Sequence, residues 1–179
     1  MRCRRHSSTR EGPGEQGRSC STSNRSREMK PLIVVCTDFS PCSEVAIERA
    51  AEIAGRDGAR VFLIHTYEPT KATAFGGPSV GQGDREAWDE SSMQRLREAR
   101  HRYFGDLADT DVQYDAIPSS HPSIEICRIA KETKASLIIV GSHGRTGVLR
   151  RLLGSVAEAT VRHAPCSVFV VREPAEPDA

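Results

Sequence analysis

The chain has 179 residues, which is enough for one well-buried domain but short for two. Hydrophobic residues make up 37% of it, and the formal net charge is +1. The first 28 residues hold seven Arg and three Glu, so residues 29–179 carry 18 basic and 21 acidic residues and are mildly acidic. The first segment has no apolar core of the kind that a secretory signal needs, and no later apolar run approaches membrane-spanning length.

Residues 1–29 are predicted to be a disordered or mis-assigned extension. Residues 1–28 contain no Leu, Ile, Val, Phe, Tyr or Trp, so they cannot bury enough apolar surface to offset the entropy lost on ordering. Met29, directly before the apolar sequence KPLIVV, is an alternative start, and a basic arm that binds nucleic acid is the sharper alternative. One domain is expected over residues 30–172, with residues 173–179 as a disordered tail.

Beyond the extension, short apolar runs alternate with amphipathic segments. The runs PLIVVCTD and ARVFLIHTYEP are typical of strands buried on both faces, and Ser40 followed by Pro41 is a suitable helix start. A Gly-rich segment over residues 70–83 predicts a long loop. In chain order, the sequence predicts a strand (31–38), a helix from Ser40 to Gly55 or Gly58, a strand (59–69), the loop, a helix (84–107), a strand (111–117), a helix from Pro122, a strand (136–141), a helix (155–163) and a strand (167–172).

Five strands that alternate with four helices predict an α/β fold, in which a mostly parallel sheet carries helices on both faces. In such sheets ligands bind beyond the carboxyl ends of the strands, where the strand order reverses. The candidate site is therefore sought after Val35, Ile64, Ile117 and Val140.

One of these strand ends leads into the glycine-rich stretch GSHGRTGVLRRLLGS. Gly141, Gly144 and Gly154 are spaced G-x2-G-x9-G, and Ser155 follows at the start of a predicted helix. Glycines let backbone N–H groups approach an anion closely, and a helix N-terminus favours negative charge. The positive side chains of the stretch are His143, Arg145, Arg150 and Arg151. A polyphosphate would suit this loop.

The same stretch has a plainer interpretation. Ser155 and Glu158 form a capping box, so Ser155 is a candidate N-cap, and adjacent arginines are commonly solvated. The stretch is neither a Walker A loop, which needs Gly-Lys-Ser/Thr, nor the GxGxxG dinucleotide fingerprint. On spacing alone, phosphate binding and simple capping both stay open.

Three segments together resemble the universal stress protein (UspA) family of the ATP-binding type. They are TDFS (37–40), FLIHT (62–66) and the glycine signature that ends in GSVAE. The resemblance covers residues 30–172. It implies a Rossmann-like fold of the adenine nucleotide alpha hydrolase type, with strand order 3-2-1-4-5 and ATP bound in the crevice between the first and fourth strands.

The resemblance implies a nucleotide site whose two halves are TDFS and the glycine stretch. Asp38 is an acceptor suited to an adenine amino group or a ribose hydroxyl, and capping of the first helix is its alternative role. The expected cofactor-binding residues are Thr37, Asp38 and Ser40 at the adenosine end, Thr66 in the base pocket, Val140 and Gly141 under the ribose, and His143, Gly144, Arg145, Gly154, Ser155 and Val156 around the phosphates.

No nucleophile elbow, metal cluster or carboxylate pair accompanies the glycine stretch, so the chain is expected to bind ATP without being an enzyme, with slow hydrolysis at most. Mg2+ would be held mainly by the phosphates. The main hypothesis is a cytoplasmic, nucleotide-dependent regulator of the stress response. The resemblance also implies a homodimer through the last strand, Ser167–Val171, and neither nucleic acid nor a membrane is expected as a partner.

Two rival hypotheses accompany this one. The first is a dimeric scaffold of the same fold that works by protein contacts without nucleotide. The second is an ATP-consuming enzyme of the related fold, which would be expected to carry a Ser-Gly-Gly-x-Asp-Ser loop after the first strand; TDFSPCS (37–43) is not such a loop. The six cysteines have neither CxxC nor zinc-finger spacing, which fits a reducing cytoplasm.

Overall fold

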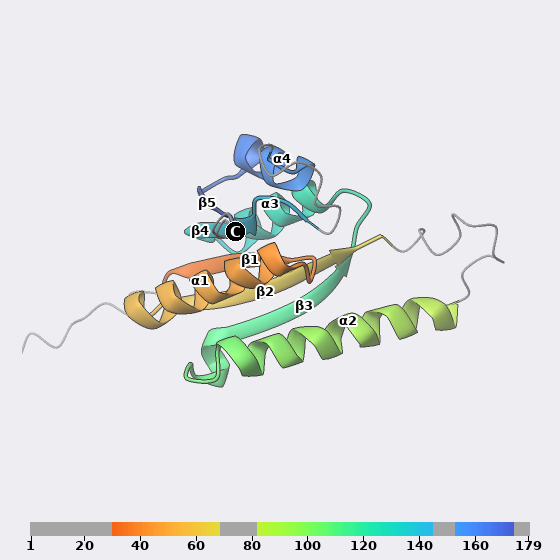
Figure 1. Ribbon diagram of the computed structural model, residues 1–179, viewed down its shortest axis with the longest axis horizontal. Helices are drawn as coiled ribbons and strands as arrows, with labels where there is room; N and C mark the ends of the chain where they lie inside the picture. The colour runs from red at the N-terminus through yellow and green to blue at the C-terminus, as the bar shows by residue number, and fades with distance from the viewer. Residues whose placement is uncertain (1–29, 69–81, 145–152, 174–179) are drawn as a thin grey trace, which may run out of the picture.

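The computed structural model describes residues 30–68, 82–144 and 153–173. Within these residues, five strands form one sheet in which all neighbours run parallel, in the order β3-β2-β1-β4-β5 (Figure 1). The strands are β1 (Leu32–Thr37), β2 (Arg60–Tyr67), β3 (Val112–Pro118), β4 (Leu137–Gly141) and β5 (Ser167–Val171). This arrangement confirms the predicted fold class and strand order.

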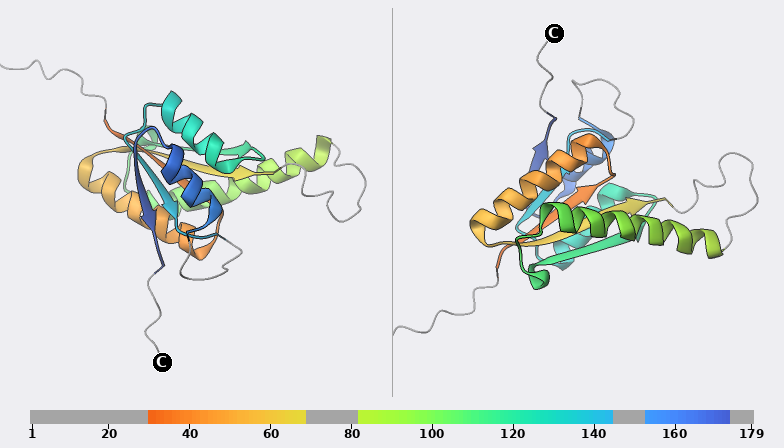
Figure 2. Two further views of the ribbon diagram at one scale, coloured as in Figure 1. Left: turned by 90° about the horizontal axis from the view of Figure 1, so that it is seen from above. Right: turned by 60° about the horizontal axis from the view of Figure 1, so that its bottom comes forward.

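Helices cover both faces of the sheet (Figures 1 and 2). On one face lie α1 (Pro41–Asp57) and α2 (Gln82–Tyr103), and on the other lie α3 (Pro122–Glu132) and α4 (Ser155–His163). A short 3-10 helix, η2 (Asp109–Asp111), precedes β3. Parallel neighbours need crossover connections, and the helices in these crossovers supply the cover that both faces of the sheet require.

The central strand β1 divides the core into two layers. Ile33 and Val35 pack with α1 and α2, whereas Leu32 and Val34 pack with α3 and α4. All four side chains are buried. The uninterrupted apolar run in this strand is therefore needed because successive side chains point to opposite, covered faces.

Local signals set the limits of α1. The Oγ atom of Ser40 accepts a hydrogen bond from the Ser43 N–H at 3.3 Å, and Pro41 is the first helical residue. The helix ends at Asp57, before Gly58 in the left-handed conformation (φ 65°). Gly55, the other expected end, lies inside the helix.

The second helix differs from its predicted limits at both ends. It begins at Gln82 instead of residue 84 and ends at Tyr103 instead of residue 107. Gly105 follows the observed end, and glycine is a poor helix former, which explains the earlier stop. The predicted extension, residues 70–81 of the predicted loop, and residues 174–179 of the predicted tail lie outside the described residues, as does residue 69, the last of the predicted strand 59–69.

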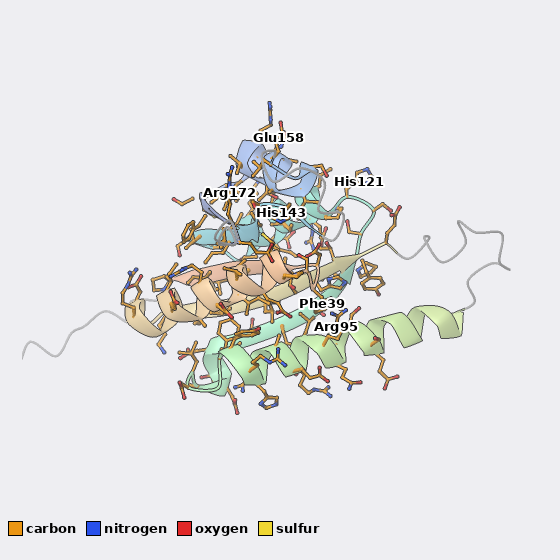
Figure 3. All side chains as sticks on the ribbon, in the orientation of Figure 1. Phe39, Arg95, His121, His143, Glu158 and Arg172 are labelled. Atoms are coloured by element: carbon orange, nitrogen blue, oxygen red, sulfur yellow. The ribbon has the colours of Figure 1, made fainter. Side chains whose placement is uncertain are left out.

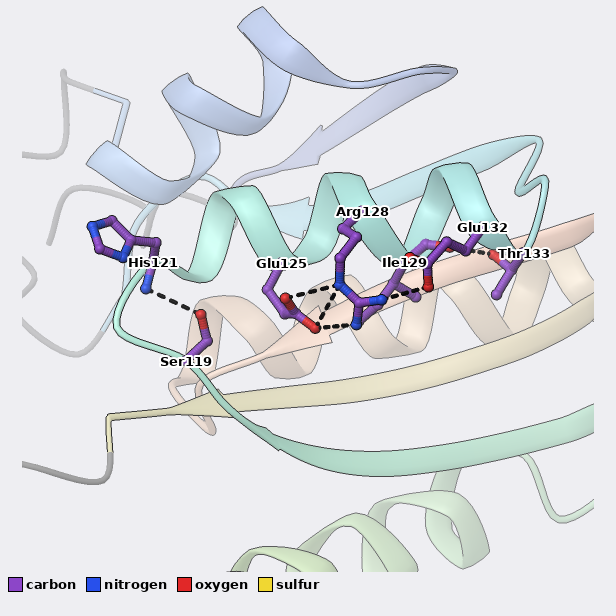
Figure 4. Close-up of polar contacts among 7 residues, drawn as sticks. All are labelled: Ser119, His121, Glu125, Arg128, Ile129, Glu132 and Thr133. Carbon is purple, nitrogen blue, oxygen red and sulfur yellow. Dashed lines mark hydrogen bonds and ion pairs between the residues drawn. The ribbon is translucent and has the colours of Figure 1, made fainter.

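The outer face of α3 carries a charged cluster (Figure 4). Arg128 pairs with Glu125 one turn before it and with Glu132 one turn after it. The hydrogen bond from Arg128 holds the pKa of the Glu125 carboxyl below its ordinary value. Half of the Arg128 side chain (50%) is exposed, so this cluster is a solvated surface feature.

Candidate functional site

Two turns meet at the carboxyl edge of the sheet. They are the β1–α1 turn (residues 37–40) and the β4–α4 connection, whose described parts are residues 141–144 and 153–154. They leave from paired strands, since β1 lies directly beside β4. A Cβ atom added at Gly144 would overlap Oδ2 of Asp38 and would lie 3.5 Å from its Cγ. The structure thus brings the two halves of the predicted site together.

Side-chain hydrogen bonds close the β1–α1 turn on itself. Oγ1 of Thr37 accepts from the Phe39 N–H at 2.9 Å. Oδ1 of Asp38 accepts from the Ser40 N–H at 3.1 Å and from the Ser40 hydroxyl at 2.6 Å. Thr37 and Ser40 are both buried. Their hydroxyls therefore shape the turn, and the half-buried Asp38 presents its carboxylate to the β4–α4 connection.

The neighbouring strand β2 supports this turn through His65, a buried residue. Nδ1 of His65 lies 2.7 Å from the carbonyl oxygen of Thr37. Because a carbonyl oxygen can only accept, Nδ1 is the nitrogen that donates. Thr66 follows His65 and is half-buried, and β1 stands between its strand and β4. Thr66, the predicted base-pocket residue, is thus separated by one strand, β1, from the strand that leads into the glycines.

Backbone contacts hold the β4–α4 connection. The Ser142 N–H donates to the carbonyl oxygen of Val171 on β5, and the Gly154 N–H donates to the carbonyl oxygen of Ser142, each at 2.7 Å. A Cβ atom added at Gly154 would lie 3.2 Å from that Ser142 oxygen and 3.3 Å from the Cα atom of His143. The missing side chain at Gly154 therefore lets the two ends of the connection touch. Arg145, with the rest of residues 145–152, lies outside the described residues.

The helix α4 begins beside this contact. Gly154 is its N-cap, with φ −65° and ψ 152°, and the Glu158 N–H donates to the Gly154 carbonyl oxygen at 2.9 Å. The interpretation of Ser155 as the N-cap is wrong, because the helix already starts at Ser155 itself. Ser155 and Val156 are exposed, whereas Ala157 is buried. The first two helical residues therefore remain accessible to a ligand.

Two predicted site residues on β4 have packing roles. Val140 is buried in the layer between the sheet and α3 and α4. A Cβ atom added at Gly141 would lie 3.1 Å from Sγ of Cys42 and 3.2 Å from its carbonyl carbon and oxygen. Gly141 thus lets the first turn of α1 approach β4.

Cys42 was missed as a residue of this region by the sequence analysis. It is buried, and its Sγ lies 3.5 Å from the carbonyl oxygen of Val171 and 3.7 Å from Oγ of Ser142. The sequence offered one signal for its burial beside the site: Cys42 lies directly after Pro41, in the first turn of a predicted amphipathic helix. Cys42 joins the start of α1 to the β4–α4 connection and to β5.

Three other thiols lie on or near the α3 and α4 side of the sheet and are half-buried. Burial raises the pKa of the Cys36 thiol, and Cys127 beside it adds to the shift. Burial also raises the pKa of Cys127 and that of Cys166. These thiols stay protonated at neutral pH and are poor nucleophiles.

His143, labelled in Figure 3, is a further polar residue of the connection. Nδ1 of His143 lies 2.9 Å from Oγ of Ser142, and Nε2 lies 3.6 Å from Oε2 of Glu173. When protonated, His143 therefore pairs with an acidic group that the sequence analysis did not consider. Among the described residues, no group of three or more His, Cys, Asp and Glu side chains could hold a metal ion. None of the helices in the described ranges combines the length and the apolar character needed to span a bilayer.

Sheet order and turns define a class first: a Rossmann-like α/β protein whose candidate ligand site lies where the paired strands β1 and β4 end. Comparison with known proteins then identifies the family. The sequence model of the universal stress protein family matches residues 31–172. The chain belongs to the universal stress protein family.

Individual relatives agree with this assignment. A universal stress protein of Methanocaldococcus jannaschii is 31% identical over 144 residues, which cover 79% of this chain and 82% of that protein. A relative from Mycobacterium tuberculosis is 30% identical over 141 residues and is longer, so that the chain spans 45% of its length. Among solved structures, a universal stress protein in complex with cAMP matches with a TM-score of 0.57 and 28% identity, covering 79% of this chain and 95% of that one.

Proposed function

We propose that this universal stress protein binds ATP where β1 and β4 end, and that it acts as a nucleotide-dependent regulator of the stress response. One observation carries the proposal: the Asp38 carboxylate of the β1–α1 turn lies against Gly144 of the β4–α4 connection. An acceptor for the nucleoside and a glycine-rich backbone for the phosphates thus occupy the same place. The solved relative in complex with cAMP supports an adenine nucleotide as the ligand class.

The proposed roles follow from the contacts around each residue. Asp38 accepts from the adenine amino group or a ribose hydroxyl, because a carboxylate next to a phosphate would repel it. Gly144, which lies against Asp38, borders the ribose. The phosphates lie over the Gly154 backbone, near the exposed start of α4, where N–H groups and the helix dipole favour an anion. His143 and Arg145 add positive charge, and Mg2+ is held mainly by phosphate oxygens.

Other expected residues act indirectly in this proposal. Thr37 and Ser40 have buried hydroxyls with partners inside the turn, so they orient Asp38. Val140 and Gly141 form the floor of the site through packing. Thr66 borders the base from the end of β2.

The test is to denature freshly purified protein and to analyse the released small molecules by mass spectrometry. An adenine nucleotide is expected among the released molecules. We also expect calorimetry to show that the protein alone binds ATP. If the protein released no adenine nucleotide and bound no ATP, the proposal would be wrong. A phosphate-release assay on the loaded protein distinguishes binding from consumption, and we expect at most slow release.

A second candidate function is suggested by the edge strand β5. Phe169 on this strand is 40% exposed, and an unpaired strand edge with an exposed aromatic side chain suits a protein contact. The proposed domain (residues 30–172) would then form a cytoplasmic homodimer through Ser167–Val171, with nucleotide as a regulator or without any role. A monomer at micromolar concentration in analytical ultracentrifugation would count against the dimer.

A further inference from the structure

Phe39 has an unusual backbone conformation within the β1–α1 turn. Its φ is +61°, in the left-handed region that an aromatic residue rarely adopts. The residue lies between the two hydrogen bonds that close the turn: its own N–H donates to Oγ1 of Thr37, and the next N–H, from Ser40, donates to Oδ1 of Asp38. The direction of the Asp38 carboxylate therefore depends on the backbone angles at Phe39.

The ring of Phe39 is held between two other elements. The centroid of the His65 ring, on β2, lies 4.4 Å from that of Phe39, with an angle of 39° between the ring planes. The Arg95 guanidinium, on α2, lies over the Phe39 ring with Cζ 3.9 Å from the centroid. Figure 3 shows the labelled Phe39 and Arg95 side chains next to each other beside α2. We call this three-residue stack the Phe39 clamp.

The clamp is fixed to the turn a second time through His65. The same imidazole that packs on Phe39 also donates from Nδ1 to the Thr37 carbonyl oxygen at 2.7 Å. The ring of Tyr67, further along β2, stacks behind it with the centroids 6.4 Å apart. The His65 ring therefore has little freedom, and it presents a rigid surface to Phe39.

We propose that Phe39 is a positioning residue of the nucleotide site: the clamp holds the turn in its left-handed conformation and so aims the Asp38 carboxylate at Gly144. A left-handed backbone is strained for a residue with a Cβ atom, so it persists only where surrounding contacts favour it. Without the clamp, the backbone at residue 39 relaxes toward negative φ, and the Asp38 carboxylate loses its fixed direction. The inference rests on the proposed function for its link to nucleotide, but the aiming of Asp38 can be measured without any ligand.

The first measurement uses the nucleotide-free protein. Gly144 lies against the Asp38 carboxylate, so its NMR resonances are expected to shift when Asp38→Asn removes that charge; we call this shift the Gly144 response. It is measured by introducing Asp38→Asn into the parent protein and into each variant. In Phe39→Ala we expect the Gly144 response to fall by at least about half, and in Phe39→Tyr, which keeps the ring, we expect it to return.

The second measurement is the affinity for ATP by calorimetry. We expect Phe39→Ala to weaken binding about tenfold, which corresponds to ~1.4 kcal/mol. Arg95→Gln keeps a long polar side chain but removes the charge over the ring, and we expect a loss of about threefold. It also serves as the variant of choice if Phe39→Ala fails to fold, because Arg95 is exposed.

A matched control lies on the same helix. Arg102 stands over the ring of Tyr103, its own neighbour, at 5.9 Å from the centroid. Arg102→Gln makes the same substitution at a longer cation–ring contact outside the Phe39 clamp, and we expect both the Gly144 response and the ATP affinity to remain as in the unmodified protein.

The outcomes separate the two proposals. If Phe39→Ala and Arg95→Gln keep the full Gly144 response, or keep the ATP affinity within about twofold of an ATP-binding parent, the positioning role is wrong. If the parent protein itself binds no ATP, the proposed function fails, while the Gly144 response still decides whether the clamp aims Asp38.

Discussion

The β1–α1 turn and the β4–α4 connection lie side by side, but they are held by different kinds of interaction. In the turn, Thr37 and Asp38 each accept a hydrogen bond from the backbone N–H two residues ahead. In the connection, backbone meets backbone: Gly154 donates to the Ser142 carbonyl oxygen, and a side chain at Gly154 or Gly144 would collide with a neighbour.

Because the two regions are held by different interactions, we expect substitutions in them to affect different properties, stability in one case and ligand binding in the other. Side chains that are buried and hydrogen-bonded within the turn contribute to folding, because their loss leaves polar groups without partners. Glycines in the connection contribute because they let protein atoms approach closely: Oδ2 of Asp38 at Gly144, and the backbone of Ser142 and His143 at Gly154. We therefore expect substitutions of the connection glycines to act mainly on affinity, and loss of the buried hydroxyls of the turn to act mainly on the free energy of unfolding.

The largest effect is expected for Gly154→Val. The branched side chain would meet the Ser142 carbonyl oxygen and the His143 Cα, which are backbone atoms that cannot rotate away. ATP affinity, measured by calorimetry, should fall at least about 100-fold, or ~2.7 kcal/mol. Gly55→Val is the matched control, because a Cβ atom at Gly55 meets nothing within 4 Å, and it should bind ATP normally. Unchanged affinity in Gly154→Val would refute the assignment of this loop.

The next effect is expected for Gly144→Ala. The new methyl group would take the space of Asp38 Oδ2, so the carboxylate must turn away from the site. We expect affinity for ATP to fall about tenfold while the free energy of unfolding stays within about 0.5 kcal/mol, because the end of one side chain can move at little cost. A loss of stability with normal affinity would reverse the contrast between the two regions.

A smaller effect, this time on stability, is expected for Ser40→Ala in the turn. Ser40 caps α1, and loss of an N-cap hydroxyl destabilises a protein by about 1 kcal/mol. Ser155→Ala at the corresponding start of α4 should change the free energy of unfolding by less than about 0.5 kcal/mol, because Gly154 holds the N-cap position there. Urea denaturation without nucleotide compares the pair, and equal losses would contradict the expected difference between the two helix starts.

The smallest effect is expected outside both regions, on the exposed face of α3. Arg128 lowers the pKa of Glu125, so the pair stabilises the folded state above the ordinary pKa of a glutamate and loses that contribution as the pH falls through the lowered value. Arg128→Ala should therefore destabilise slightly at pH 7, by less than Ser40→Ala, and not at all once Glu125 is protonated. Urea denaturation at pH 7 and at a pH where Glu125 is protonated provides the measurement. Because Arg128 lies outside both regions of the site, a change in ATP affinity in Arg128→Ala would contradict this prediction.

Much of the fold could be predicted because its signals are local. Continuous apolar runs predict strands that are buried on both faces. The runs of β1 and β4 confirm this, because their side chains pack in both layers of the core. Ser40 and Pro41 start α1 as their chemistry indicates. The end of α2 was less predictable, because Leu107 still packs against the core after the helix has stopped at Tyr103.

The candidate site was predictable where spacing alone describes it. The glycine at position 154 reflects a backbone contact with Ser142 and His143 that a larger residue would disturb. The sequence favours a packed, hydrogen-bonded role for His65 at the end of its strand, and the structure confirms it. The inward roles of Thr37 and Cys42 were not predictable, because each depends on partners brought together by the fold; Cys42 and Ser142 are 100 positions apart. The conformation of Phe39 also depends on a ring from β2 and a cation from α2, neither of which is adjacent in sequence.

The central position of β1 has a consequence for the order in which the molecule is assembled. Its pairing with β2 joins Leu32 to Arg60, whereas its pairing with β4 joins Ile33 to Leu137. During synthesis from the amino end, β1, β2 and β3 can form a sheet while the other side of β1 still lacks its neighbour. An apolar strand with an open side is where a second chain can attach. The arrival of β4 therefore does two things in one step: it covers the open side of β1, and it brings the β4–α4 connection to the β1–α1 turn.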